Sequence, residues 1–210
     1  TSNTTAIFGG IGLWFKNRLL RILCFVIIAL VAFSRLYLGV HTPEDVLVAM
    51  IIGFSAIFVS KKLLEWLSKN PEKDITVLVT VLIVCILATV YTLVKPYPEG
   101  SNVGLRLDSI KTIGIVIGGI LGWFWERRAI RFSHVKNIWL NIAIFVFGIA
   151  ILLVIQTYTE GFLNSIFGDM IGNLLRNSLC TFWIMGLYPF IFSNLIKKFN
   201  IKTTPANVEQ

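Results

Sequence analysis

A short polar segment between two apolar runs combines the residue types that phosphoryl transfer needs. The segment reads Ser34-Arg35-Leu36-Tyr37-Leu38-Gly39-Val40-His41-Thr42-Pro43-Glu44-Asp45. A guanidinium such as that of Arg35 offers a planar fork of donors to phosphate oxygens. An imidazole such as that of His41 acts as nucleophile or general base near neutral pH, and a carboxylate four residues later, Asp45, can fix its tautomer. Together these groups have the chemistry of phosphoryl transfer through a phosphohistidine.

A purely structural interpretation of the same residues is also open. Thr42 followed by Pro43 and acidic residues is typical of a helix start, with Thr as the N-cap, Pro at the first helical position and carboxylates near the positive end of the helix dipole. In that interpretation Asp45 only caps the helix, Arg35 lies at the membrane interface and His41 is an ordinary loop residue. In the functional interpretation, the backbone N–H groups of this helix start add an anion site.

The composition indicates that membrane-spanning helices position this segment. Of the 210 residues, 56% are hydrophobic and 14% are charged, whereas about 25% are charged in an ordinary soluble domain. These values exclude a soluble fold and a disordered chain. The net charge of +8 comes from short basic blocks between apolar runs, a pattern that favours membrane topology over nucleic-acid binding. The three cysteines lie inside apolar runs without CxxC spacing, which predicts buried thiols rather than a metal or redox site.

Charge-free runs predict about seven transmembrane helices, because about 20 mostly apolar residues cross the hydrocarbon core. Three runs are long enough on their own, namely 75–94, 137–159 and 177–196. Four shorter runs need flanking Lys or Arg side chains that reach the interface, namely 1–15, 22–34, 46–60 and 112–125. The predicted fold class is therefore an all-α, polytopic membrane helix bundle.

The basic residues concentrate in every second connection, which predicts the orientation of the helices. The basic connections, expected to face the cytoplasm, contain Lys16, Arg18 and Arg21, then Lys61, Lys62, Lys69 and Lys73, then Arg127, Arg128, Arg131 and Lys136, and finally Lys197, Lys198 and Lys202. The connections 35–45, 95–111 and 159–176 hold fewer basic residues and are expected to face outward. We therefore expect a multi-pass protein of the cell membrane whose segment 34–45 lies on the outer face.

The segment 34–45 resembles the third motif of the phosphatidic acid phosphatase type 2 superfamily, which shares its fold with the vanadium haloperoxidases. That motif is S-R-x5-H-x3-D, and Ser34, Arg35, His41 and Asp45 occupy all four fixed positions. Average composition would give this match by chance in about one of a thousand chains of this length. The resemblance implies that Arg35 and Ser34 bind the phosphate, that His41 attacks phosphorus and that Asp45 orients His41. It implies no metal ion and no other cofactor.

Two further motifs of that superfamily, K-x6-R-P and P-S-G-H, do not occur in these 210 residues. The polar residues 1–5 look like the start of the helix that the P-S-G-H motif opens, so the chain is expected to be a C-terminal fragment that is inactive alone. Residues 1–67 would then be the C-terminal half of the catalytic core, 68–196 additional transmembrane helices and 197–210 a mobile cytoplasmic tail. More weakly, residues 111–132 resemble the C-terminal extension of bacterial members.

Three other features of the second half are interpreted structurally. Gly114, Gly118 and Gly122 recur at every fourth residue, which predicts one helix face cleared for close packing. Glu160 is expected to be solvated in an outer loop, and Arg176 is expected to anchor at the outer headgroups.

These observations predict an integral membrane phosphatase that hydrolyses a lipid phosphate or an isoprenyl diphosphate such as undecaprenyl diphosphate. Membrane lipids would surround it, the apolar tail of the substrate would lie between helices, and no nucleic acid is expected as a partner. Two alternatives stay open. One is transfer of the phospho group to an acceptor other than water at the same residues, and the other is a transporter or assembly subunit with a relic motif. The sequence indicates neither the particular lipid nor the oligomeric state.

Overall fold

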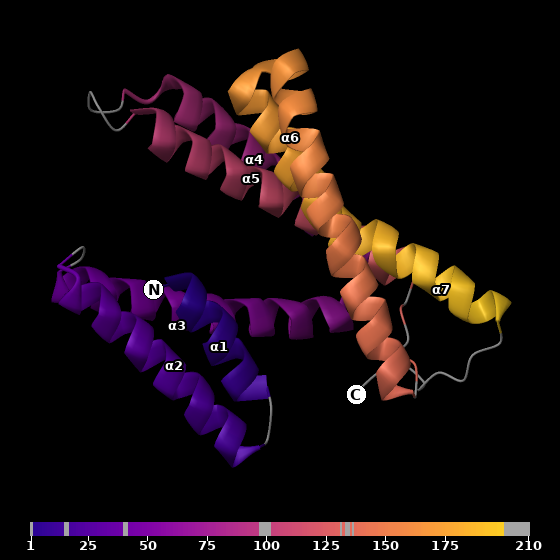
Figure 1. Ribbon diagram of the computed structural model, residues 1–210, viewed down its shortest axis with the longest axis horizontal. Helices are drawn as coiled ribbons and strands as arrows, with labels where there is room; N and C mark the ends of the chain where they lie inside the picture. Colours follow the sequence, from indigo (N-terminus) through magenta and orange to yellow (C-terminus); the bar gives the residue numbers. More distant parts are fainter. Residues whose placement is uncertain are drawn as a thin grey trace. The chain divides into compact units, whose positions relative to one another are not determined.

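The computed structural model describes residues 2–14, 17–39, 42–96, 102–130, 132, 135 and 137–199. The described part of the chain is helical and contains no β-strand, which confirms the all-α fold (Figure 1). The helices are α1 (Ser2–Trp14), α2 (Arg18–Tyr37), α3 (Pro43–Lys69), α4 (Asp74–Val94), α5 (Asn102–Trp125), α6 (Ile138–Phe182) and α7 (Tyr188–Lys198). Three short segments join them: the 3₁₀ turn η1 (Pro71–Lys73) and the π-helical segments η2 (Glu126–Ile130) and η3 (Trp183–Leu187).

Within the described ranges, five helical stretches are long and apolar enough to cross a membrane, so the expected count of seven is not confirmed. They are Arg18–Tyr37, Pro43–Lys69, Pro71–Val94, Gly104–Ile130 and Ile138–Lys198. Two features account for the difference between seven predicted runs and five stretches. The helix α1 has only 13 residues, about 20 Å at 1.5 Å per residue. The last stretch runs for 61 residues through α6, η3 and α7 and contains two of the predicted runs, 137–159 and 177–196.

The helix α6 is interrupted at Gly168, where φ is 75° and ψ is 166°. That backbone conformation is accessible essentially only to glycine. In Figure 1, α6 therefore doubles back on itself, so that its second half runs antiparallel to its first half before the chain reaches α7. We call this the α6 hairpin. Two of the predicted runs, 137–159 and 177–196, lie on its two arms and their continuation.

Residues Thr1–Lys73 form one compact unit, in which α1 packs against both α2 and α3. Glycines on α1 permit these contacts. A Cβ atom on Gly9 would lie 2.9 Å from Cδ1 of Ile57 in α3, and a Cβ atom on Gly12 would lie 3.3 Å from Cβ of Cys24 in α2. Arg21 on α2 also donates from Nε to the carbonyl oxygen of Gly12 over 3.2 Å. The short helix α1 thus connects the two helices that carry the motif residues.

Residues Asp74–Gln210 form the second unit, in which α5 packs against both α4 and α6. The glycines of α5 face the returning arm of the α6 hairpin and η3. Cβ atoms on Gly114 and Gly118 would collide with the carbonyls of Leu174 and Ser178, and one on Gly122 would collide with Cβ of Met185. The structure thus confirms the prediction that this glycine series serves close helix packing.

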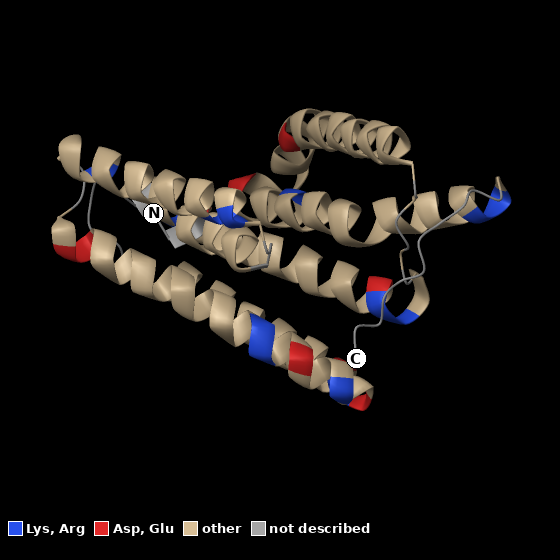
Figure 2. Cartoon of the chain, turned by 90° about the horizontal axis from the view of Figure 1, so that it is seen from below, with Lys and Arg blue, Asp and Glu red and all other residues tan. Residues whose placement is uncertain are grey.

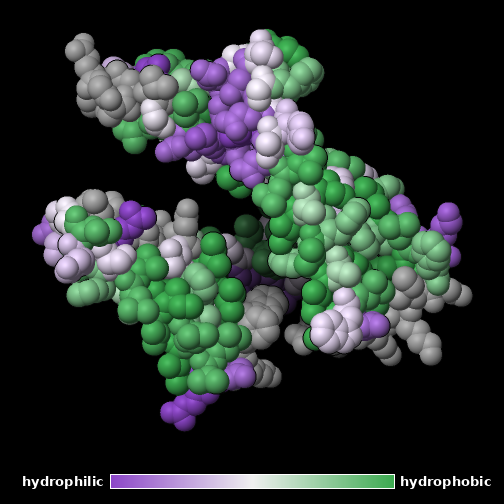
Figure 3. Space-filling model, viewed as in Figure 1, coloured by the Kyte–Doolittle hydropathy of each residue, from purple (hydrophilic) through white to green (hydrophobic). Residues whose placement is uncertain are grey.

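Lipid is the expected solvent for most of the surface. Large apolar side chains such as Phe33, Leu87 and Phe145 remain more than 60% exposed, and hydrophobic residues cover much of the face drawn in Figure 3. Figure 2 shows the charged residues mainly toward the ends of the helices, with long uncharged stretches between them. This distribution is that of a multi-pass membrane protein.

Candidate active site

The predicted phosphate-binding residues, Ser34 and Arg35, lie in the last turn of α2, and both side chains are exposed. The helix ends through bonds from the N–H of Leu38 to the carbonyl of Ser34 and from the N–H of Gly39 to the carbonyl of Leu36, each 3.0 Å long. Gly39 has a φ of 64°, a left-handed conformation that glycine adopts without a steric penalty at the end of a helix. Gly39, which ends α2, is therefore one of the five residues that separate Arg35 from His41 in the motif.

The side chains of these two residues differ in their bonding. The hydroxyl of Ser34 donates to the carbonyl oxygen of Val31 over 3.1 Å, so it has to rotate before it can donate to a phosphate. Arg35 forms no ion pair with another of the described residues. Among the motif side chains that the structure describes, the guanidinium of Arg35 is therefore available to an anion in this conformation.

Asp45 lies in the first turn of α3 and forms a capping box with Thr42. The N–H of Thr42 donates to Oδ2 of Asp45 over 3.0 Å, and the N–H of Asp45 donates to Oγ1 of Thr42 over 3.2 Å. Pro43 occupies the first helical turn. The structural interpretation of this helix start is therefore confirmed. It does not conflict with a functional role for Asp45, because a carboxylate can accept several hydrogen bonds.

The predicted nucleophile, His41, lies outside the described residues, as do Val40, Arg131 and His134. The structure describes both flanks of His41, namely Gly39 at the end of α2 and Thr42 at the start of α3. Three of the four motif residues are thus placed at the two ends of one short connection. The part of the chain that the structure describes contains no cluster of three or more His, Cys, Asp or Glu residues that could hold a metal ion.

Comparison with protein-family models decides the family. Residues 1–69 match the model described as PAP2 superfamily, and residues 110–200 match the model described as PAP2 superfamily phosphatase, transmembrane extension. The chain belongs to the PAP2 superfamily. The first match contains all four residues of the S-R-x5-H-x3-D pattern, so the resemblance derived from that pattern is confirmed. Neither the curated proteins nor the solved structures include a match to this chain.

Membership of the PAP2 superfamily identifies a membrane phosphatase in general terms. The second match assigns the α5 glycines and the α6 hairpin to the transmembrane extension of PAP2 phosphatases. Residues 111–132, which were expected to resemble an extension found in this superfamily, lie within this match.

Two ion pairs of the second unit were not predicted from the sequence. Nη1 of Arg176 lies 2.6 Å from Oε2 of Glu160 across the α6 hairpin, although Glu160 was expected to be only solvated. Nε of Arg127 lies 2.8 Å from Oδ2 of Asp74, whose side chain is buried at the start of α4. The sequence alone could have indicated that Arg176 forms an ion pair, because an ionisable residue next to an apolar run needs a partner. The identity of the partners depends on tertiary packing.

Proposed function

We propose that the protein containing this chain hydrolyses a lipid phosphate or an isoprenyl diphosphate at the outer membrane face, with His41 as the nucleophile. The observation that carries the proposal is the PAP2 superfamily match over residues 1–69, which includes Arg35, His41 and Asp45 at the spacing of the third motif. The exposure of Arg35 and Asp45 at the two ends of the α2–α3 connection supports a site open to a substrate headgroup.

In the proposed reaction, Arg35 binds two phosphate oxygens and offsets the charge of the transferring group. An imidazole nitrogen of His41 forms a bond to phosphorus while the bond from phosphorus to the leaving oxygen breaks. The leaving alkoxide or phosphate takes a proton from a general acid. Water then attacks the phosphohistidine, which releases inorganic phosphate and restores His41.

Asp45 has two tasks in this proposal. One carboxylate oxygen accepts the capping bond from Thr42, and the other accepts the N–H of the imidazole nitrogen that does not attack. The second bond fixes the tautomer and stabilises the positive charge that develops on the ring. Backbone N–H groups at the start of α3 add positive potential near the phosphate.

The general acid is not identified in this chain, because the P-S-G-H motif does not occur in the 210 residues. We propose that a histidine of the full-length protein supplies it. Losing a positioned acid typically costs 10²–10⁴-fold in rate, so phosphate release has to be measured with the full-length protein.

The proposal is tested by phosphate release from phosphatidic acid and from an isoprenyl diphosphate in detergent. The chain contains two histidines, so His134→Ala is a matched control for His41→Ala. We expect no release above background with His41→Ala and full release with His134→Ala. Wild-type release with His41→Ala would refute the mechanism. Consumption of the substrate without free phosphate, together with a phosphorylated alcohol, would instead indicate transfer to an acceptor other than water.

A further inference from the structure

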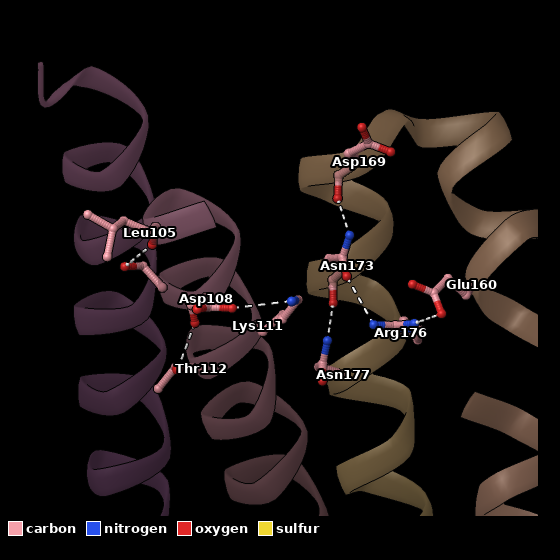
Figure 4. A network of polar contacts seen from close by, with 10 residues as sticks. Leu105, Asp108, Lys111, Thr112, Glu160, Asp169, Asn173, Arg176 and Asn177 are labelled. Atoms are coloured by element: carbon pink, nitrogen blue, oxygen red, sulfur yellow. Dashed lines mark hydrogen bonds and ion pairs between the residues drawn. The ribbon is translucent and has the colours of Figure 1, made fainter. Parts of the chain in front are cut away.

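A second group of polar residues lies in the transmembrane extension, where α5 packs against the α6 hairpin (Figure 4). It comprises Lys111 on α5 and Asn173, Arg176 and Asn177 on the returning arm of the hairpin, together with the carboxylates of Asp108 and Glu160. We call these six residues the outer polar cluster. None of them belongs to the S-R-x5-H-x3-D motif.

Lys111 lies on the side of α5 that packs against the returning arm of the α6 hairpin. Lys111 and Gly114 are three residues apart and therefore share a face of α5. That face contacts the returning arm, because a Cβ atom on Gly114 would lie 3.2 Å from Cβ of Asn177. Figure 4 shows Lys111 extending from α5 toward the arm that carries Arg176.

The depth of the cluster follows from the length of the hairpin. Glu160 lies 22 residues after Ile138, the first residue of α6, a rise of about 33 Å at 1.5 Å per residue. The hydrocarbon core is about 30 Å thick. Trp139 is exposed at the start of α6, a typical position for an inner interface anchor. With this end at the inner interface, the Glu160–Arg176 pair lies at the depth of the outer lipid headgroups.

The two side chains of the Glu160–Arg176 ion pair differ in solvent exposure. This difference would allow another anion to replace the carboxylate of Glu160. The side chain of Arg176 is 9% exposed, whereas that of Glu160 is 57% exposed. The cation is therefore held inside the helix packing, and its anionic partner lies at the surface. A guanidinium has five N–H donors, and the bonds of Arg176 in the structure run from Nη1 to Glu160 and from Nη2 to Oδ1 of Asn173 over 3.1 Å.

The amides around Arg176 are fixed in place. Nδ2 of Asn173 donates to the carbonyl of Asp169 over 2.7 Å, and Nδ2 of Asn177 donates to the carbonyl of Asn173 over 2.8 Å. Hydrophilic residues also gather on the face drawn in Figure 3, where α5 meets α6. Arg176 is thus a pre-positioned cation beside a polar surface at headgroup depth.

We propose that the outer polar cluster binds the phosphate of an anionic lipid headgroup, with Arg176 and Lys111 as its cations. The carboxylate of Glu160 occupies the anion position in the structure, and a lipid phosphate displaces it because a phosphate brings more charge and more acceptor oxygens. This site is separate from the motif residues and does not depend on hydrolysis at His41.

The competing explanation is that the Glu160–Arg176 ion pair only stabilises the α6 hairpin. Variants that replace either charged residue by glutamine distinguish this explanation from a phosphate site. Both Arg176→Gln and Glu160→Gln remove the same ion pair, so a purely structural ion pair predicts that neither variant binds phosphatidic acid more tightly than the parent. A phosphate site predicts opposite effects. Arg176→Gln removes the cation that binds the phosphate, whereas Glu160→Gln removes the anion that competes with it.

The experiment measures binding of radiolabelled phosphatidic acid to the full-length protein in phosphatidylcholine nanodiscs. All variants carry Arg35→Gln, so that phosphate binding at the motif does not contribute. We expect Arg176→Gln to weaken binding about tenfold or more, since a bond to a charged group is lost, and Lys111→Gln to weaken it less. We expect Glu160→Gln to bind at least as tightly as the parent. Lys95→Gln, at a cation that directly follows α4 and lies outside the cluster, should leave binding unchanged.

The double variant Arg176→Gln/Glu160→Gln covers the case in which an unpaired charge prevents folding, because it leaves no uncompensated charge at the pair. We expect it to elute as folded protein and to bind weakly. Tight binding of phosphatidic acid by this double variant would overturn the proposal. An equal loss of affinity in the two single variants would also overturn it. Inorganic phosphate is the second arm of the test. Displacement of the lipid by an equal concentration of inorganic phosphate would overturn the lipid assignment.

Discussion

The backbone N–H of Thr42 donates to the carboxylate of Asp45 over 3.0 Å, and the backbone N–H of Asp45 donates to the hydroxyl of Thr42 over 3.2 Å. This reciprocal pair attaches Asp45 to the residue that follows His41 in the chain. The helix cap therefore restrains the position of the carboxylate that we propose as the partner of the nucleophile.

We expect Asp45→Asn to lower turnover by on the order of 10²–10⁴-fold in the full-length protein, because an amide neither fixes the imidazole tautomer nor offsets its charge. The nucleophile remains, so residual activity should be measurable. The asparagine oxygen can still cap the helix, so thermal unfolding should change little. Thr42→Val is the matched control, because it loses the cap, typically worth about 1 kcal/mol, and keeps the carboxylate. A larger loss of turnover with Thr42→Val than with Asp45→Asn would show that the Thr42–Asp45 pair matters only for folding.

Gly118→Ala should destabilise the transmembrane extension, because its Cβ would overlap the carbonyl of Ser178. Overpacking of this kind costs about 1–3 kcal/mol. Gly104 is the control on the same helix, since a Cβ atom there meets nothing within 4 Å. Thermal unfolding in detergent should show a lower transition for Gly118→Ala and no decrease for Gly104→Ala. Equal stabilities would contradict the close packing of α5 on the α6 hairpin.

Gly168→Ala tests the turn of the α6 hairpin. With φ at 75° and ψ at 166°, any other residue is strained by about 1–3 kcal/mol. Gly161 lies on the same hairpin in helical conformation with open space at its Cβ position, so Gly161→Ala should be neutral or slightly stabilising. Thermal unfolding in detergent compares the stabilities of the Gly168→Ala and Gly161→Ala variants. A neutral Gly168→Ala would show that α6 does not turn at this residue.

The sequence predicted the helical fold, the motif and the glycine packing, because each depends on local pattern. Hydrophobic runs predict helices, and the Thr42–Asp45 cap follows from residues three positions apart. The predicted count of seven spans is not confirmed, because α1 is short and because the runs 137–159 and 177–196 belong to one helical stretch, which turns at Gly168. The partners of Arg176 and Arg127 also could not be predicted, because Glu160 and Asp74 are brought to them by helix packing.

The proposed orientation can be tested with an impermeant thiol reagent in intact cells. Single cysteines at Leu38 and at Ala129, both exposed positions, are placed in a background without Cys24, Cys85 and Cys180. We expect labelling only at position 38, because basic connections such as that of Arg127 and Arg128 remain in the cytoplasm. Both positions should react after the membrane is permeabilised. Labelling only at position 129 in intact cells would reverse the orientation.

The central proposal is that His41 carries the phospho group during turnover. The most direct measurement quenches the full-length protein during reaction with lipid labelled with ³²P in its phosphate and locates the label by peptide mapping. We expect an acid-labile, alkali-stable phosphate on the peptide that contains His41, which is absent in His41→Ala and retained in His134→Ala. Steady release of phosphate with no label on that peptide, or label that persists in His41→Ala, would contradict the proposed mechanism.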